Sequence, residues 1–141
     1  MSTHSNYRSV SVFLTVCALA FAAIGINTFV DPLSAMAPLN LDVNTPGALN
    51  ELRANYGGMQ LGMAVLLALG LLKPALRHPA LVAQALLVGG LAAGRLVSWS
   101  VDGVLPQFNA ILLGVEVATA LLSVVGLCVE NKKVETQHVG A

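Results

Sequence analysis

The stretch SVSVFLTVCALAFAAIGINTFV, residues 9–30, decides the fold of this chain. It holds no charged residue. It also reaches the length of about 20 mostly apolar residues that a helix needs to cross the hydrocarbon core of a bilayer. Asp31-Pro32 ends the run, because a proline disfavours helical backbone in the residue before it. The run is too long for a signal peptide and ends in Val-Asp-Pro rather than a small-x-small site, so we expect a retained helix.

Three further apolar runs follow, at about residues 48–72, 79–101 and 107–129. The second stops at Lys73-Pro74, and the third begins at Pro79, a residue suited to the first turn of a helix. The sequence therefore predicts an all-α, antiparallel bundle of four transmembrane helices in one domain, residues 1–130. We expect segment 31–47 to be an outer loop that caps the bundle. We expect residues 131–141 to be a polar, disordered tail.

Composition supports a membrane protein and argues against several other classes. Of the 141 residues 56% are hydrophobic and only 10% are charged, whereas soluble domains carry roughly 25% charged residues. The formal charge is zero, so we expect no nucleic-acid partner. Cys17 and Cys128 lie in separate apolar runs outside any C-x-x-C pattern, and we interpret both as inert packing residues. The three histidines are scattered along the chain, so the sequence predicts no metal site and no cofactor.

Charge placement orients the four helices. The basic residues Arg8, Lys73, Arg77, Lys132 and Lys133 fall on one side of the predicted bundle. The loops of the opposite side, with the residues beside them, carry Asp31, Asp42, Glu51 and Asp102, and Arg53 is the one basic residue there. By the positive-inside rule, we expect both termini in the cytoplasm and the helices in the inner membrane of the cell.

Polar residues gather in the outer halves of the helices. Arg95 lies outside the middle of the third helix and Glu116 just outside the middle of the fourth, at depths that differ by about 5 Å. Antiparallel neighbours bring such residues together, so the sequence predicts an Arg95–Glu116 ion pair, which lowers the cost of burying both charges. The inner halves are almost purely apolar, apart from Cys17 and Gln84.

Other polar residues share helix faces at the same end. Ser98 and Asp102 follow Arg95 on one face of the third helix, and Asn27 and Asp31 are one turn apart at the end of the first. On the second helix Arg53, Tyr56 and Gln60 recur at spacings of three and four residues. Acidic residues outnumber arginines on this side, and the surplus needs water, a cation or a raised pKa. This favours an outward-facing polar pocket.

We expect this pocket to bind a small lipid-like or quinone-like amphiphile, with its polar head at the charged residues and its tail along the apolar halves. The bilayer itself is the other partner that the sequence implies. The expected ligand-binding residues are Asn27, Asp31, Arg53, Tyr56, Gln60, Arg95, Ser98, Asp102 and Glu116.

Two alternatives remain open. The first is a cofactor-independent enzyme, an isomerase or an epoxide-opening hydrolase, with catalytic residues Tyr56, Arg95, Asp102 and Glu116. In that case Glu116 or Asp102 serves as the acid or base, Arg95 holds an oxyanion and Tyr56 donates a proton. The second is a structural or accessory subunit, in which Arg95–Glu116, and Arg53 with Glu51 or Asp31, only fix the helix register.

Glycines are spaced for close helix packing. Gly58-x-x-x-Gly62 and Gly90-x-x-x-Gly94 are expected to let helices approach closely, and the same faces suit a homo-oligomer. A second interpretation is that Gly57 and Gly58 leave space for a ligand beside Tyr56.

The segments RANYGGMQLG (53–62) and GRLVSWSVDG (94–103), followed by a proline and then a glutamate in the next helix, reach beyond general hydropathy. With them, residues 9–129 resemble a family of small bacterial four-helix membrane proteins whose domain has no assigned function. The resemblance implies a four-helix membrane fold and no established chemistry. Its motif residues here are Arg53, Tyr56, Gly57, Gly58, Gly62, Gly94, Arg95, Ser98, Asp102, Gly103, Pro106 and Glu116.

Overall fold

A computed structural model describes the backbone of residues 3–41, 43 and 45–139, and the side chains of residues 8–41, 43 and 45–131. Asp42, one of the acidic residues expected on the outer side, lies outside the described residues. The long helical elements are α1 (Thr3–Val30), the composite of α3 (Pro46–Glu51), η2 (Leu52–Gly58) and α4 (Met59–Leu72), α5 (Pro74–Asp102) and α6 (Gln107–Val139). The short helices α2 (Pro32–Met36) and η1 (Ala37–Leu39) follow α1.

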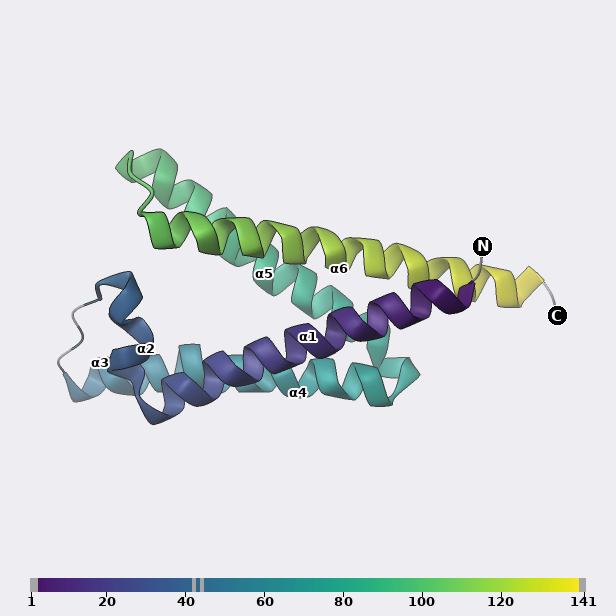
Figure 1. Cartoon of the computed structure of the whole chain (residues 1–141), viewed down its shortest axis with the longest axis horizontal. Coiled ribbons are helices and arrows are strands. Elements are labelled where there is room, and N and C mark those ends of the chain that lie inside the picture. Colours follow the sequence, from purple (N-terminus) through teal and green to yellow (C-terminus); the bar gives the residue numbers. More distant parts are fainter. Residues whose placement is uncertain (1–2, 42, 44, 140–141) are drawn as a thin grey trace.

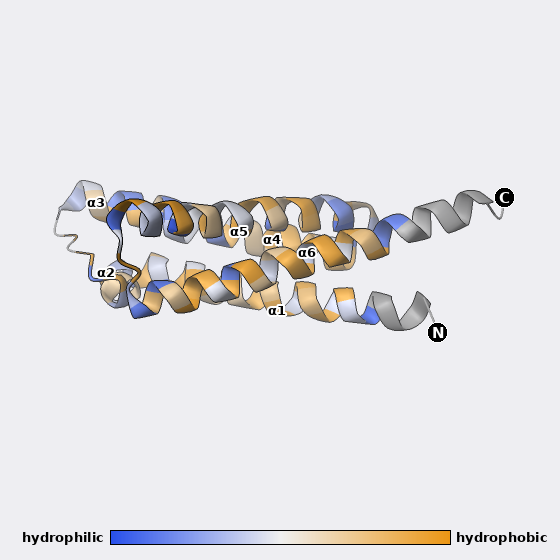
Figure 2. Ribbon diagram, turned by 90° about the horizontal axis from the view of Figure 1, so that it is seen from above, coloured by the Kyte–Doolittle hydropathy of each residue, from blue (hydrophilic) through white to orange (hydrophobic). Residues whose placement is uncertain are grey.

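Four segments are long and apolar enough to cross a membrane: Arg8–Val30, Pro46–Leu72, Pro74–Asp102 and Gln107–Asn131. The predicted all-α fold with four membrane-capable helices is therefore confirmed, and the chain has the architecture of a multi-pass membrane protein. Many large apolar side chains face outward, among them Leu72 and Val101 at 78% and 76% exposure. Hydrophilic segments gather toward the two ends of the molecule (Figure 2). Such a surface suits lipid around the middle of the helices.

The four helices form two antiparallel pairs. One pair joins α1 to η2 and α4, and the other joins α5 to α6 (Figure 1). Both termini and the α4–α5 connection lie at one end, which we call the inner end; the opposite end, with α2 and α3, is the outer end. The two pairs diverge toward the outer end in Figure 1, where η1 contacts α6.

The hydrophobic core lies toward the inner end. Its buried residues, which come from α1, α4 and α5, are Val10, Leu14, Cys17, Leu67, Ala80 and Leu81. Helix α6 packs against them. Gly70 permits the tight α4–α5 turn, since a Cβ there would lie 2.9 Å from the Cβ of Ala80. The inner end therefore holds the two pairs together.

Local side chains set the helix ends. Asp31 caps α2 by accepting a hydrogen bond from the backbone N–H of Ser34 at 3.2 Å, and Thr45 caps α3 by accepting one from Ala48 at 3.2 Å. Gly103 ends α5 with a left-handed backbone (φ 70°), a conformation that strongly favours glycine. The predicted outer loop, 31–47, thus contains two short helices and the start of α3.

Two predicted boundaries are wrong. The third helix begins at Pro74 rather than at Pro79, because Lys73 is extended and Pro74 itself takes the first helical position; Pro79 lies inside α5. The fourth helix continues to Val139 instead of ending near residue 129. Residues 131–139 contain neither proline nor glycine, so nothing in them breaks the helix. Residues 140 and 141, the last two of the predicted tail, lie outside the described residues.

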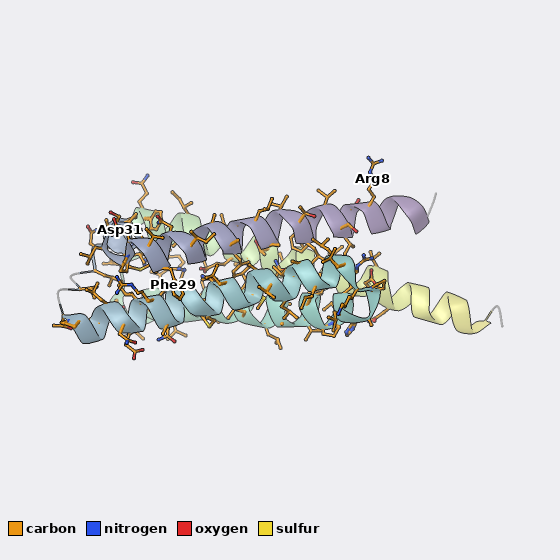
Figure 3. The ribbon with its side chains drawn as sticks, turned by 90° about the horizontal axis from the view of Figure 1, so that it is seen from below. Arg8, Phe29 and Asp31 are labelled. Carbon is orange, nitrogen blue, oxygen red and sulfur yellow. The ribbon has the colours of Figure 1, made fainter. Side chains whose placement is uncertain are left out.

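The structure contradicts two of the expectations about the glycines. Phe29 extends from α1 toward the second helix (Figure 3), where its ring fills the space beside Gly57: a Cβ at Gly57 would overlap Phe29 Cδ2. The interpretation of Gly57 as ligand space is therefore wrong. Among the described residues, a Cβ added at Gly62, Gly90 or Gly94 would meet no side chain and no other helix within 4 Å, so their expected role in close packing within the chain is wrong as well. Self-association through these faces stays a prediction.

Candidate functional site

The predicted Arg95–Glu116 pair is present, and it joins α5 to α6 in their outer halves. Arg95 Nε donates to both carboxylate oxygens of Glu116, at 2.9 Å to Oε1 and 2.8 Å to Oε2. Glu116 is only 8% exposed, while the side chain of Arg95 keeps 22% of its surface exposed. The sequence positions these residues by simple antiparallel register, and the pairing stabilises two charges that lipid alone would not solvate.

The pairing leaves part of the Arg95 guanidinium unused. A guanidinium carries five N–H donors, and four of these belong to its two Nη groups. Within the described part of the chain, only Nε of Arg95 has a hydrogen-bond partner, and that partner is Glu116. The Nη edge of Arg95 can therefore donate to water, lipid or a ligand.

Ser98 and Asp102 form a separate contact on the exposed face of α5. The Ser98 hydroxyl donates to Asp102 Oδ2 at 2.7 Å. We expected Arg95 to lie between two carboxylates, but only one of them contacts it. Glu116 accepts from Arg95, whereas Asp102 accepts from Ser98, one turn away. Seven residues separate Arg95 from Asp102, about 10 Å along a helix, which explains why the nearer serine takes the carboxylate.

Arg53 binds a helix end rather than an acid. Its Nε donates to the backbone carbonyl of Phe29 at 3.2 Å, next to the last residue of α1, where the helix dipole favours a cation. Glu51 accepts instead from Asn55 Nδ2 at 2.7 Å, and Asp31 caps α2. The expected pairing of Arg53 with Glu51 or Asp31 is therefore wrong.

The sequence analysis missed the π-helical form of η2, which carries Arg53 and Tyr56. This wider helix covers Leu52–Gly58, and Tyr56 is 43% exposed on it. Short π-helical segments inside α-helices are rare and are often found at functional sites. The adjacent pair Gly57-Gly58 is the only sequence signal for it, because two glycines weaken the α-helical preference at this point.

The nine expected ligand-binding residues fall into two groups. Arg95, Ser98, Asp102 and Glu116 lie on the α5–α6 pair, while Asn27, Asp31, Arg53, Tyr56 and Gln60 lie on α1, its C-terminal cap and the second helix. Gln60 Oε1 is buried without a partner among the described residues, and Asn27 is exposed. Gln60 lies near the middle of the second membrane-capable segment, and the other residues of both groups are toward the outer end. No hydrogen bond or ion pair joins the two groups in the described part of the chain.

The inner part of the bundle also holds polar contacts. Arg77 on α5 lies 3.6 Å from Glu130 on α6 (Nη1 to Oε1), and its Nε donates to the carbonyl of Gly70 at 3.4 Å. Ser123 is also fully buried, and its hydroxyl donates to the carbonyl of Thr119. Among the described residues no three His, Cys, Asp or Glu side chains gather as metal ligands.

A family model with the description domain of unknown function (DUF4345) matches residues 9–127. The matched range includes both groups of outer polar residues and nearly all of the four membrane-capable segments. Comparison with the curated proteins gave no match, and comparison with the solved structures gave none. The match confirms the resemblance seen in the sequence motifs.

Proposed function

The chain belongs to the family of the domain of unknown function DUF4345, and we propose that it binds a small amphiphile in the outer half of the α5–α6 pair. In this proposal the protein lies in the inner membrane with both termini in the cytoplasm, as its basic residues favour. Arg95 is the binding residue, and Glu116 is the residue that positions it.

The main support for the proposal is that Glu116 holds one donor of the Arg95 guanidinium and leaves the other donors available. Glu116 fixes Nε with two short hydrogen bonds, so the plane of the guanidinium is held, while the Nη donors have no partner among the described residues. A pair needed only for helix register does not require a partly exposed arginine. A held donor edge that is open to its surroundings suits a ligand with acceptor oxygens.

The depth of Arg95 narrows the kind of ligand. It lies about 10 Å from the outer end of α5, and half of a hydrocarbon core measures about 15 Å. The Nη edge is thus below the level of phospholipid phosphates. A compact polar head, such as a carbonyl or a carboxyl, can reach this depth if its apolar tail lies along exposed neighbours such as Leu91, Leu96 and Val115.

The acid/base enzyme is less well supported. That hypothesis depends on a carboxyl near the middle of the membrane that is incompletely paired. Both oxygens of Glu116 accept hydrogen bonds from Arg95, and Asp102 is exposed and bonded to Ser98. Arg53 and Tyr56 also lie at the outer end, and this position is the one reason to assign them a role in binding the same amphiphile.

Native mass spectrometry tests the proposal, with protein extracted directly into lipid nanodiscs. Arg95→Lys keeps the charge and removes the planar donor edge, and we expect the occupancy of a bound small molecule to fall at least tenfold. Arg77→Lys is the matched control, because Arg77 also faces a glutamate across the α5–α6 pair; this variant keeps the bound molecule.

The exchange variant Arg95→Glu/Glu116→Arg separates binding from a structural role. It preserves an ion pair at the same place but moves the guanidinium to α6. We expect it to unfold at about the wild-type temperature and to lose the bound molecule. A wild-type protein that carries no small molecule, or an exchange variant that carries as much as wild type, contradicts the proposal and favours the structural subunit.

A further inference from the structure

Polar residues recur at three levels along the contact between α5 and α6. On α6, Glu116, Ser123 and Glu130 are spaced seven residues apart, a spacing that returns to the same face of a helix. Opposite them on α5, Arg95 meets Glu116 at the outer level and Arg77 meets Glu130 at the inner level. The level between these two ion pairs holds the remaining polar residues.

Gln84 and Ser123 form this middle level. Arg77 faces Glu130, and Leu81 packs on Gly126, where a Cβ would lie 3.1 Å from Leu81 Cδ2. The same antiparallel register places Gln84 level with Ser123. Both residues are 0% exposed, so their side chains are in the interior of the bundle rather than in lipid.

The Gln84 amide has hydrogen-bonding capacity that the protein does not use. Neither Nε2 nor Oε1 has a hydrogen-bond partner among the described residues. The Cys17 thiol of α1 lies within hydrogen-bonding reach of this amide. Because a thiol is only a weak donor and acceptor, this contact does not satisfy the amide. The Ser123 hydroxyl donates to the Thr119 carbonyl at 2.8 Å, which leaves its oxygen able to accept a second hydrogen bond.

We propose that Gln84 and Ser123 bind an internal water molecule midway between the two ion pairs. The water donates to Gln84 Oε1 and to Ser123 Oγ and accepts from Gln84 Nε2. A buried water is stable when it finds two to four polar partners, and a buried amide without any partner is costly. This site is separate from the amphiphile site and does not depend on it.

Solid-state NMR in lipid bilayers tests the water site, with glutamine labelled at the side-chain nitrogen. The chain has glutamines at positions 60, 84, 107 and 137, and the signal lost in Gln84→Leu is the one of interest. We expect a cross-peak between the Gln84 amide protons and water. Ser123→Ala should weaken this cross-peak severalfold, because it removes one of the three hydrogen bonds of the water.

Two controls make the result specific. Ser123→Thr restores the hydroxyl and should restore the cross-peak, and Ser98→Ala, on the exposed face of α5, should leave it unchanged. An amide that shows contacts only to Cys17 or to acyl chains overturns the proposal. A cross-peak that is equally strong in Ser123→Ala also overturns it, because Ser123 is then not a ligand of the water.

Discussion

Arg77 and Arg95 lie on the same helix and face glutamates of the same neighbouring helix, but they use their donors differently. Arg77 divides its contacts between the Gly70 carbonyl and Glu130 and so ties α4, α5 and α6 together near the core. Arg95 gives only Nε to Glu116, in the half of the molecule where the helix pairs diverge. Position in the bundle, rather than residue type, therefore distinguishes a structural arginine from a candidate binding arginine.

Gly57 and Gly62 lie on the same composite helix but differ in the space around them. Gly57→Ala should lower the free energy of unfolding by about 1–3 kcal/mol, a range typical of overpacking, because the Phe29 ring occupies the place of the new methyl group. Gly62→Ala is the matched control on the same helix, with open space around it, and should lose nothing. Thermal unfolding in detergent measures both.

A second variant shows whether the ring is the cause. Phe29→Leu frees space beside Gly57, so Gly57→Ala should cost less in that background than in the wild type. Equal losses in both backgrounds would mean that the new methyl group does not act through Phe29. A loss in Gly62→Ala would point to a neighbouring molecule on that face.

At the scale of elements, short helices depend on single capping residues. The side-chain hydroxyl and the backbone N–H of Ser34 both donate to the Asp31 carboxylate, and these hydrogen bonds lower the pKa of Asp31. A lowered pKa means that the cap stabilises α2 fully above the ordinary Asp value of about 3.9. This contribution is lost as the pH falls through the lowered folded pKa.

Amide hydrogen exchange at Ser34 measures this loss. Protection of α2 should decrease as the pH falls below about 4, after correction for the intrinsic exchange rate. In Asp31→Asn the decrease should vanish, because asparagine also caps helices but does not titrate. The same acid dependence in both proteins would assign it to another group.

Some features of these elements follow from the sequence, and others do not. The membrane-capable helices and the Arg95–Glu116 pair follow from apolar length and antiparallel register, and both can be counted directly in the sequence. The π-helical form of Leu52–Gly58 does not, because one extra residue in a turn hardly changes hydropathy. The Phe29 carbonyl was missed as the partner of Arg53 for a related reason. Backbone carbonyls at helix ends compete with acids for arginine, and no sequence pattern indicates which of them will bind.

On the scale of the whole molecule, the core is near one end and the candidate binding residue is toward the other. The two helix pairs are held together around Leu14, Leu67 and Leu81, which are 0% exposed. The two pairs diverge toward the outer end (Figure 1), so changes there should affect stability less. This division would allow the outer half to take up the proposed ligand without loss of the fold.

Leu67→Ala and Leu96→Ala test this division. Leu67 is fully buried and Leu96 is 47% exposed on α5. The first change should lower the free energy of unfolding by about 2–5 kcal/mol, as for other buried leucines, and the second by less than about 1 kcal/mol. Similar losses at both positions would show that the outer half is packed as tightly as the core, by lipid or by a second copy.

Orientation in the membrane decides from which leaflet the proposed amphiphile would reach Arg95. In the proposed orientation, which the positive-inside rule favours, Arg8 and Arg77 lie at the cytoplasmic end of the bundle. Figure 3 shows Arg8 directed away from the other helices, a direction that suits contact with lipid head groups. In a cysteine-free background, Gly47→Cys near the start of α3 should react with a membrane-impermeant maleimide in intact cells. His78→Cys, near the inner end of α5, should react only after permeabilisation. The opposite labelling pattern would place the Arg95–Glu116 pair in the cytoplasmic half of the bilayer, and the amphiphile would then have to enter from that leaflet.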